Sequence, residues 1–265
     1  DQPLATRQAP PQLPSLNTAA DLGQGRALFC APGSDWLLLY NPAQANVAQW
    51  VHLVGAIACA PTPLGYGFVA PLGMGQVFYL GVTDGARLAT PFQPRVEAQS
   101  TLAYKPAAPV GTDGRQFVVT DGGNRLYLVD VVNQPQPHLE AVKQADVGPR
   151  PITSGLYVLG ETVLGVASDS RVVRFKLPSL ESAGESNLTA PVEWGPFVAG
   201  DVIVLATADQ KLSALAAAGE ARWQVPLEHG PLAGAPLVRP DCIVLAYRNG
   251  TIERRAIADG KVLGT

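Results

Sequence analysis

The chain has 265 residues, a formal net charge of −3, and a composition that is 47% hydrophobic but only 15% charged. A chain this long and this apolar can bury the core of a large all-β domain, which excludes disorder along most of its length. The small negative charge argues against attraction to nucleic acid or to an anionic membrane, and no apolar run approaches the length of a membrane span.

Residues 1–15 carry several prolines among Gln, Ala and Ser, without apolar periodicity. We interpret this segment as a Pro-rich linker or an N-terminal arm, and residues 16–265 as one domain. The sequence opens at Asp1 without an initiator Met, which favours a processed chain or a domain of a longer protein.

The clearest copy of a repeating unit lies at residues 195–227. An apolar run at Val202–Leu205 leads into a polar turn at Asp209–Lys211, and a second apolar run follows at Leu212–Leu215. After another turn, a last short run contains Trp223. Four short strands joined by tight turns within about 40 residues are typical of one blade of a β-propeller.

The first apolar residue of the third strand recurs at spacings of 41, 49, 46, 40 and 40 residues, by subtraction of successive positions. These anchor residues are Trp36, Val77, Leu126, Val172, Leu212 and Ile252. The period predicts an all-β β-propeller of six four-stranded blades, within a range of five to seven. The first strand is then expected near Thr18–Gln24, and the N-terminal arm is a candidate to supply a strand to the closing blade.

Several segments follow the pattern of a known repeat. They are Leu126–Asp130, Thr83–Leu88 and Ala258–Leu263. Over roughly residues 20–265 the units resemble the PQQ-like, or quinoprotein-like, β-propeller repeat, as a degenerate and non-catalytic member. The resemblance implies that Trp50 and Trp223 are docking tryptophans that pack between neighbouring blades. It also favours an exported or periplasmic location.

Quinoprotein dehydrogenases with this repeat use a vicinal Cys-Cys pair, a stacking Trp, a calcium ion and an Asp base. This chain has three cysteines that are not adjacent: Cys30, Cys59 and Cys242. Each lies among apolar residues, which predicts buried thiols, with one disulfide among them as the alternative. We therefore expect no catalytic residues, no bound quinone and no other cofactor.

The three histidines lie in different units, without the spacing of metal ligands. They are His52, His138 and His229. No GxSxG segment is present to mark a nucleophilic serine. The sequence therefore predicts no metal site and no hydrolase site.

A row of cations is the one pattern that suggests a binding surface. Arg125, Arg171 and Lys211 directly precede the anchor in three successive units, and Arg248 lies close to this position in another. If the repeats are related by rotation, these side chains lie on one face around a central channel. The loops between units add further members to this predicted rim: Arg95, Tyr104, Lys105, Arg150, Trp194 and His229. The alternative is that these are solvated turn residues without a ligand.

Three functions are compatible with these features. The first is a non-catalytic propeller that binds a protein or peptide as an interaction or assembly scaffold. The second is a ligand- or cofactor-binding accessory domain of a redox enzyme. The third is a purely structural domain that docks on its neighbours in a longer chain. We expect a protein or peptide partner, and neither nucleic acid nor a membrane span.

Overall fold

The computed structural model describes residues 5–6, 10, 12, 15–16, 18–44, 47–94 and 102–265. These residues form antiparallel β-sheets and no helix, which confirms the predicted all-β fold class of a β-propeller with six blades. Among them there is accordingly no helix long and apolar enough to span a membrane. The chain divides into two compact units, Asp1–Ile152 and Thr153–Thr265. Each unit holds the strands of three blades.

Blade 1 is a sheet of five strands in the order β1-β5-β4-β3-β2. Its strands are β1 (Ala5–Thr6), β2 (Thr18–Gly23), β3 (Arg26–Cys30), β4 (Trp36–Tyr40) and β5 (Ala48–His52). The start of β2 agrees with the predicted first strand. Within the segment interpreted as an arm, the described pair of residues in β1 hydrogen-bonds to β5 as an extra outer strand. The described part of the arm therefore adds a strand to the first blade.

Blades 2 and 3 complete the first unit. Their strands are β6 (Thr62–Leu64), β7 (Gly67–Pro71) and β8 (Val77–Gly81), then β9 (Ala108–Val110), β10 (Gln116–Thr120), β11 (Arg125–Val132) and β12 (His138–Asp146). Blade 2 has three continuous strands, and isolated bridges from β8 to Arg87 and Phe92 stand in place of a fourth. Blade 3 has four strands, as predicted.

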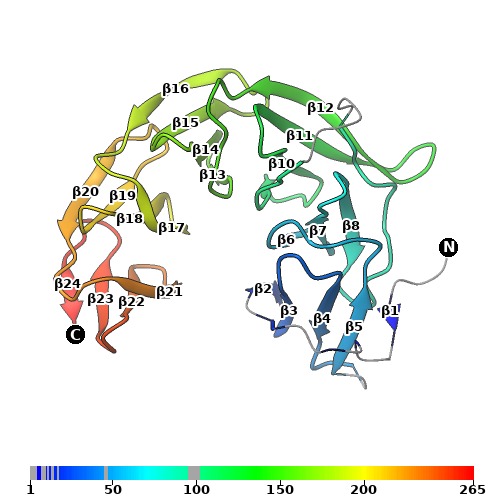
Figure 1. Ribbon diagram of the computed structural model, residues 1–265, viewed down its shortest axis with the longest axis horizontal. Helices are drawn as coiled ribbons and strands as arrows, with labels where there is room; N and C mark the ends of the chain where they lie inside the picture. The colour runs from blue at the N-terminus through cyan, green and yellow to red at the C-terminus, as the bar shows by residue number, and fades with distance from the viewer. Residues whose placement is uncertain are drawn as a thin grey trace. The chain divides into compact units, whose positions relative to one another are not determined.

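The second unit consists of three four-stranded sheets, which follow one another in chain order (Figure 1). Blade 4 contains β13 (Tyr157–Leu159), β14 (Thr162–Val166), β15 (Arg171–Lys176) and β16 (Ser182–Asn187). Blade 5 contains β17 (Val192–Ala199), β18 (Val202–Thr207), β19 (Lys211–Leu215) and β20 (Ala221–Pro226). Blade 6 contains β21 (Leu232–Val238), β22 (Cys242–Tyr247), β23 (Ile252–Ala256) and β24 (Val262–Gly264).

The core of each unit lies between successive blades. In the first unit, Leu37 and Leu39 of β4 pack with Phe68 and Leu80 of blade 2. In the second unit, all six residues of β18 are buried, because blade 5 is covered on both faces. A strand that is covered on both faces loses the usual alternation of polar and apolar residues, which explains the continuous apolar run read from the sequence.

Trp223 packs between blades 5 and 6. Only 8% of its surface is exposed, and its indole Nε1 donates a hydrogen bond of 2.7 Å to the carbonyl of Ile257. A Cβ atom added to Gly260 would lie 2.7 Å from the Trp223 ring, so the ring sits directly on the backbone of that turn. This is the contact that a docking tryptophan makes.

Trp50, which was expected to make the same contact in blade 1, lies on the other face of its strand. It is half-buried and packs edge-on against Trp36, with ring centroids 6.5 Å apart. Its neighbour Val51 is fully buried instead and approaches Gly85 in the next blade. The anchor of blade 1 is therefore Leu37, and a shift of one residue moves a side chain to the opposite face of a sheet.

Candidate functional site

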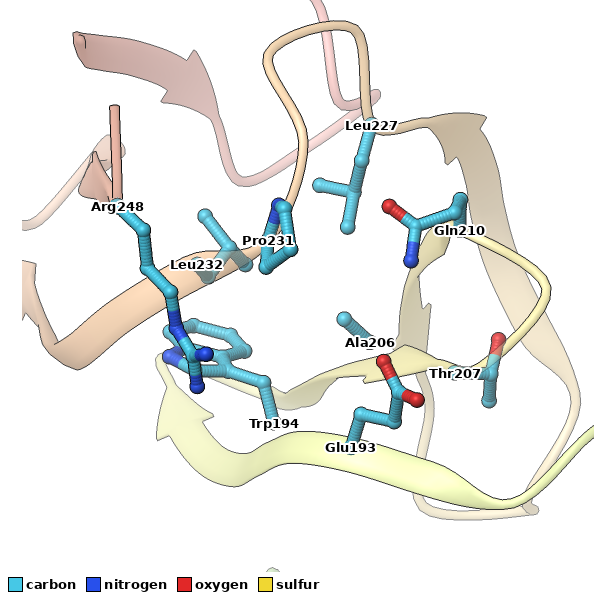
Figure 2. Close-up of a pocket in the computed structure, with 9 residues that line it drawn as sticks. All are labelled: Glu193, Trp194, Ala206, Thr207, Gln210, Leu227, Pro231, Leu232 and Arg248. Atoms are coloured by element: carbon cyan, nitrogen blue, oxygen red, sulfur yellow. The ribbon is translucent and has the colours of Figure 1, made fainter. Parts of the chain in front are cut away.

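A pocket of about 290 Å³ lies between blades 5 and 6, within the second unit (Figure 2). We call it the blade 5–6 pocket, and its lining residues are Glu193, Trp194, Ala206, Thr207, Gln210, Leu227, Pro231, Leu232 and Arg248. Two of these, Trp194 and Arg248, belong to the predicted rim. The remaining members, Glu193 and Gln210 among them, carried no signal in the sequence, because a pocket depends on which turns the blades bring together.

Trp194 forms one wall of the pocket. It was expected in a loop between units, but it lies within β17, where the pairing with β18 is irregular on both sides of it. Its indole Nε1 donates a hydrogen bond of 2.6 Å to the carbonyl of Gly234 in β21. Trp194 therefore bridges two blades, and its only N–H group is already used. Phe197 packs against the Trp194 ring with centroids 4.7 Å apart, so the ring surface outside that contact is what remains for a ligand.

Arg248 follows β22, in the turn that leads to β23. Position 249 lies 40 residues after Asp209, which occupies the equivalent turn of blade 5. Asp209 pairs with Lys211 at 2.7 Å, whereas blade 6 has Asn249 and Thr251 at the corresponding positions. The turn of blade 6 therefore lacks the acid and the cation that the turn of blade 5 has, and it carries Arg248 one residue earlier.

Arg248 and Glu193 have charges that nothing in the second unit neutralises. Both are exposed, and among the residues that the structure describes neither side chain forms an ion pair or a hydrogen bond. Figure 2 shows Arg248 reaching from its turn toward the side of Trp194, while Glu193 and Gln210 enter from other segments. The pocket therefore combines an apolar wall with one unused guanidinium and one unused carboxylate.

A buried polar cluster holds the segments that carry the pocket. Glu253 of β23 is fully buried and accepts hydrogen bonds from Arg255 and from the Tyr247 hydroxyl, the latter at 2.9 Å. The imidazole Nε2 of His229 lies 3.7 Å from the same carboxylate. Tyr247 directly precedes Arg248 in the chain, so the cluster anchors the turn that bears this guanidinium. Burial raises the pKa of Tyr247 to about 12, which keeps its hydroxyl protonated as a donor.

Arg171 and Lys211, the rim cations of the second unit that directly precede an anchor, are paired with acids of their own turn or of the adjacent strand. Arg171 contacts Asp169 at 2.8 Å and also Glu185, and Lys211 contacts Asp209. The hydrogen bond from Lys211, with another from Thr207, lowers the pKa of Asp209 to about 2. Asp209 therefore remains charged at neutral pH, and the ion pairs of Arg171 and Lys211 leave little net positive charge on the surface.

The rim members of the first unit differ in exposure. Arg125 and Arg150 are exposed, and Lys105 is half-buried. Tyr104 is 1% exposed and donates a hydrogen bond of 3.1 Å to the carbonyl of Gly75, so it belongs to the core and not to a surface rim. Arg95 lies outside the described residues.

The cysteines do not fit a quinone site. All three are free and buried, and none is adjacent to another in sequence. Burial raises the pKa of the Cys30 thiol to about 11 and that of Cys59 to about 12, so both are protonated at neutral pH. In the part of the chain that the structure describes, no three His, Cys, Asp or Glu residues are grouped to hold a metal ion.

These features define the class of the protein, which is a β-propeller. Residues 168–263, from blade 4 to the last strand, match a family model described as outer membrane protein assembly factor BamB. A search among curated proteins found no match to the chain.

Solved structures of propellers share the fold at low sequence identity. BamB from Moraxella catarrhalis matches 90% of this chain and 72% of its own, with 15% identity and a TM-score of 0.60. The computationally designed Ika8 protein matches 96% of this chain and 74% of its own, with 12% identity and a TM-score of 0.68. The propeller domain of Cps50 (Swd1) from Myceliophteria thermophila matches 86% of this chain and 79% of its own, with 13% identity and a TM-score of 0.62.

Proposed function

We propose that this chain is a non-catalytic β-propeller that binds a protein or peptide partner and acts as an interaction or assembly scaffold. Rigid sheets hold the turns and loops at the ends of the blades in fixed positions, which suits recognition by loop side chains. The observation that carries the proposal is the blade 5–6 pocket, where Arg248 and Glu193 have no charged partner and lie beside an apolar wall. One of the solved propellers similar to this chain carries the name BamB, and the matched family model is described as an outer membrane protein assembly factor.

The predicted cationic rim has a secondary role in this proposal. Arg125 and Arg150 are exposed, whereas Arg171 and Lys211 are paired with acids of their own turns. A paired cation contributes little to the field that a partner meets beyond about 8–10 Å at physiological salt. We therefore expect the rim to change the rate of association more than the affinity.

The alternative, an accessory domain that binds a redox cofactor, has less support. The described residues offer protonated buried thiols and no group of three metal ligands. The main argument for this alternative is the resemblance to PQQ-like repeats. A repeat of this kind defines how strands are arranged and does not define a cofactor site.

A comparison of partner binding by matched variants tests the proposed function. The wild-type chain, Arg248→Glu and the control Arg239→Glu are immobilised, and proteins retained from the source extract are identified and then purified. Arg239 is also exposed and unpaired among the described residues of blade 6, but it does not line the pocket. We expect a partner that binds the wild type and the control at least about ten-fold more tightly than Arg248→Glu, because charge reversal opposes the same partner group.

The triple variant Arg125→Ala, Arg171→Ala and Lys211→Ala provides the second arm. It should slow association and reduce its salt dependence, while the melting temperature stays within a few degrees of the wild type. A purified partner that binds all variants equally would exclude the pocket as its site. Catalytic turnover by the purified chain would contradict the scaffold proposal itself.

A further inference from the structure

The size of the blade 5–6 pocket limits what it can hold. Its volume of about 290 Å³ lies at the lower end of the range of about 300–1,000 Å³ that ligand pockets span. This space accommodates one large side chain with its flanking backbone, and it is too small for a quinone cofactor together with a substrate. The occupant that fits a propeller scaffold is therefore a short segment of a partner chain.

One part of the pocket wall is apolar and favours an apolar side chain. Leu227, Pro231 and Leu232 contribute aliphatic surface, and Trp194 contributes aromatic surface. Because the Trp194 N–H is occupied by Gly234, the indole has no free donor that would favour a polar ligand at this wall. Removal of an apolar side chain from water is the favourable term that such a surface provides.

Arg248 selects a carboxylate beside that apolar group. A guanidinium presents parallel N–H donors that match the two oxygens of a carboxylate, and this one has no acid within the described chain. Blade 6 has Asn249 and Thr251 where blade 5 has Asp209 and Lys211, so the turn that carries Arg248 supplies no acid of its own. A ligand carboxylate is thus the missing half of a bidentate pair.

Glu193 restricts the ligand to a single negative charge. Its carboxylate lines the same pocket and is also unpaired. A phosphate, with a charge of about −1.5 to −2 at neutral pH, is repelled more strongly than a carboxylate by a neighbouring acid. Gln210 has no side-chain hydrogen bond among the described residues, so its amide is free to bind peptide backbone next to the ligand side chain.

We propose that the blade 5–6 pocket binds a peptide motif in which a large apolar side chain packs on Trp194 and an adjacent carboxylate pairs with Arg248. This inference rests on the proposed function as a partner-binding scaffold and names the chemistry of the partner. The carboxylate has two sources with the same chemistry, an acidic side chain within a chain or the terminal carboxylate of a chain that ends in an apolar residue.

Titration of the full chain with short peptides, followed by the Trp194 indole N–H resonance in an NMR spectrum, tests the proposal. The resonance is assigned from a Trp194→Phe variant.

The probes are a blocked hexapeptide with Phe-Asp at its centre, the same peptide with Phe-Asn, Phe-Lys or Phe-phosphoserine, and an unblocked peptide that ends in Phe. We expect saturable shifts with Phe-Asp or with the terminal Phe, and at least about five-fold weaker binding of Phe-Asn and phosphoserine. Binding of the Phe-Asp peptide would identify an acidic side chain as the source of the carboxylate, and binding of the peptide that ends in Phe would identify a chain terminus.

Variants of the two charged residues give the decisive comparison. Arg248→Gln should weaken binding of the carboxylate peptide at least about ten-fold, whereas Arg239→Gln should leave its affinity unchanged. Arg248→Glu should reverse the preference from Phe-Asp to Phe-Lys, and Glu193→Gln should improve binding of the phosphoserine peptide relative to Phe-Asp. Melting curves show whether each variant is folded.

Equal binding of Phe-Asp and Phe-Asn, or equal losses in Arg248→Gln and Arg239→Gln, would overturn the inference. So would the absence of any saturable shift with the carboxylate peptides. If a protein partner is found that depends on Arg248 while no peptide binds, the scaffold function stands and this ligand assignment fails. If the peptides bind as expected but no protein partner is found, the ligand assignment stands and the scaffold function fails.

Discussion

At the scale of single residues, a few close contacts decide how the blades of each unit meet. Gly260 has a φ of +72° and lies directly under the ring of Trp223, so two constraints act on one position. Gly250, in another turn of the same blade, has a φ of +91° but no atom near the place where a Cβ would be. The two glycines therefore separate the cost of backbone strain from the cost of a lost contact.

Replacement of each glycine by alanine tests the contact. Gly250→Ala should cost about 1–2 kcal/mol in the free energy of unfolding, because an L-residue is strained at positive φ. Gly260→Ala should cost at least about 1–3 kcal/mol more, since its new methyl group also displaces the Trp223 ring. Chemical denaturation measures both values. Equal costs for the two variants would show that Trp223 does not depend on this glycine.

The two tryptophans of blade 5 should differ in the same measurement. Trp223→Ala should cost about 3–5 kcal/mol, because it empties a buried site between two blades. Trp194→Ala should cost less, about 1–2 kcal/mol, since the ring is half-buried and one hydrogen bond to Gly234 is lost. A larger loss for Trp194→Ala would contradict the relative burial of the two rings.

At the scale of elements, the third strand of blade 6 buries alternate side chains. In β23, Glu253 and Arg255 are buried, whereas Ile252 is 60% exposed. A buried ion pair in a strand is stabilising only when both partners stay and their remaining donors and acceptors are satisfied. Here Tyr247 and the carbonyl of Gly260 provide those additional partners.

Removal of one partner of this pair should be more damaging than removal of both. Arg255→Met leaves the Glu253 carboxylate buried without its cation, which should cost about 3–5 kcal/mol. Adding Glu253→Leu to that variant should restore part of the loss, because no uncompensated charge remains. A double-mutant cycle in denaturant measures the coupling. Additive losses in that cycle would mean that the two side chains do not act as a pair.

The turn before β19 should make stability depend on pH. Asp209 has its pKa lowered to about 2 by hydrogen bonds from Lys211 and Thr207. A carboxylate with a lowered pKa stabilises the fold above its unfolded pKa of about 4, and this contribution disappears as the pH falls through about 2. Asp209→Asn should therefore lower the melting temperature at pH 6 but not at pH 2. The same difference at both pH values would exclude this ionisation as the cause.

At the scale of the whole molecule, repeated blades supply positions for side chains, and the residues at those positions decide what chemistry is available. The chain has three free, buried cysteines and no adjacent pair. Quinoprotein chemistry needs groups that act together at one place, and the raised pKa values of Cys30 and Cys59 leave these thiols protonated at neutral pH.

The purified chain should accordingly show no quinone absorbance and no dehydrogenase turnover after addition of PQQ and calcium. An optical spectrum and an artificial electron-acceptor assay measure the two properties, with a quinoprotein dehydrogenase as the positive control. Stoichiometric PQQ binding with turnover would overturn the proposal of a non-catalytic propeller.

The sequence by itself determined the repeat. Its period places all six third strands within one residue of their observed starts, from β4 to β23, because each blade needs the same succession of apolar runs and turns. It also predicted the PQQ-like resemblance that the family model matches over residues 168–263. Local patterns of this kind survive in a single sequence, since strand and turn preferences act over a few residues.

Only the tertiary structure decided which face each side chain occupies and which turns meet. The period could not separate Trp50 from Val51, because neighbouring residues of a strand differ only in the face they present. It also could not reveal that Tyr104 is buried, that Trp194 spans two blades, or that Arg248 and Glu193 share a pocket. These facts depend on contacts between segments that lie far apart in the chain, with 29 residues between Gly75 and Tyr104 and 40 between Trp194 and Gly234. Contacts between repeats arise only when the blades pack.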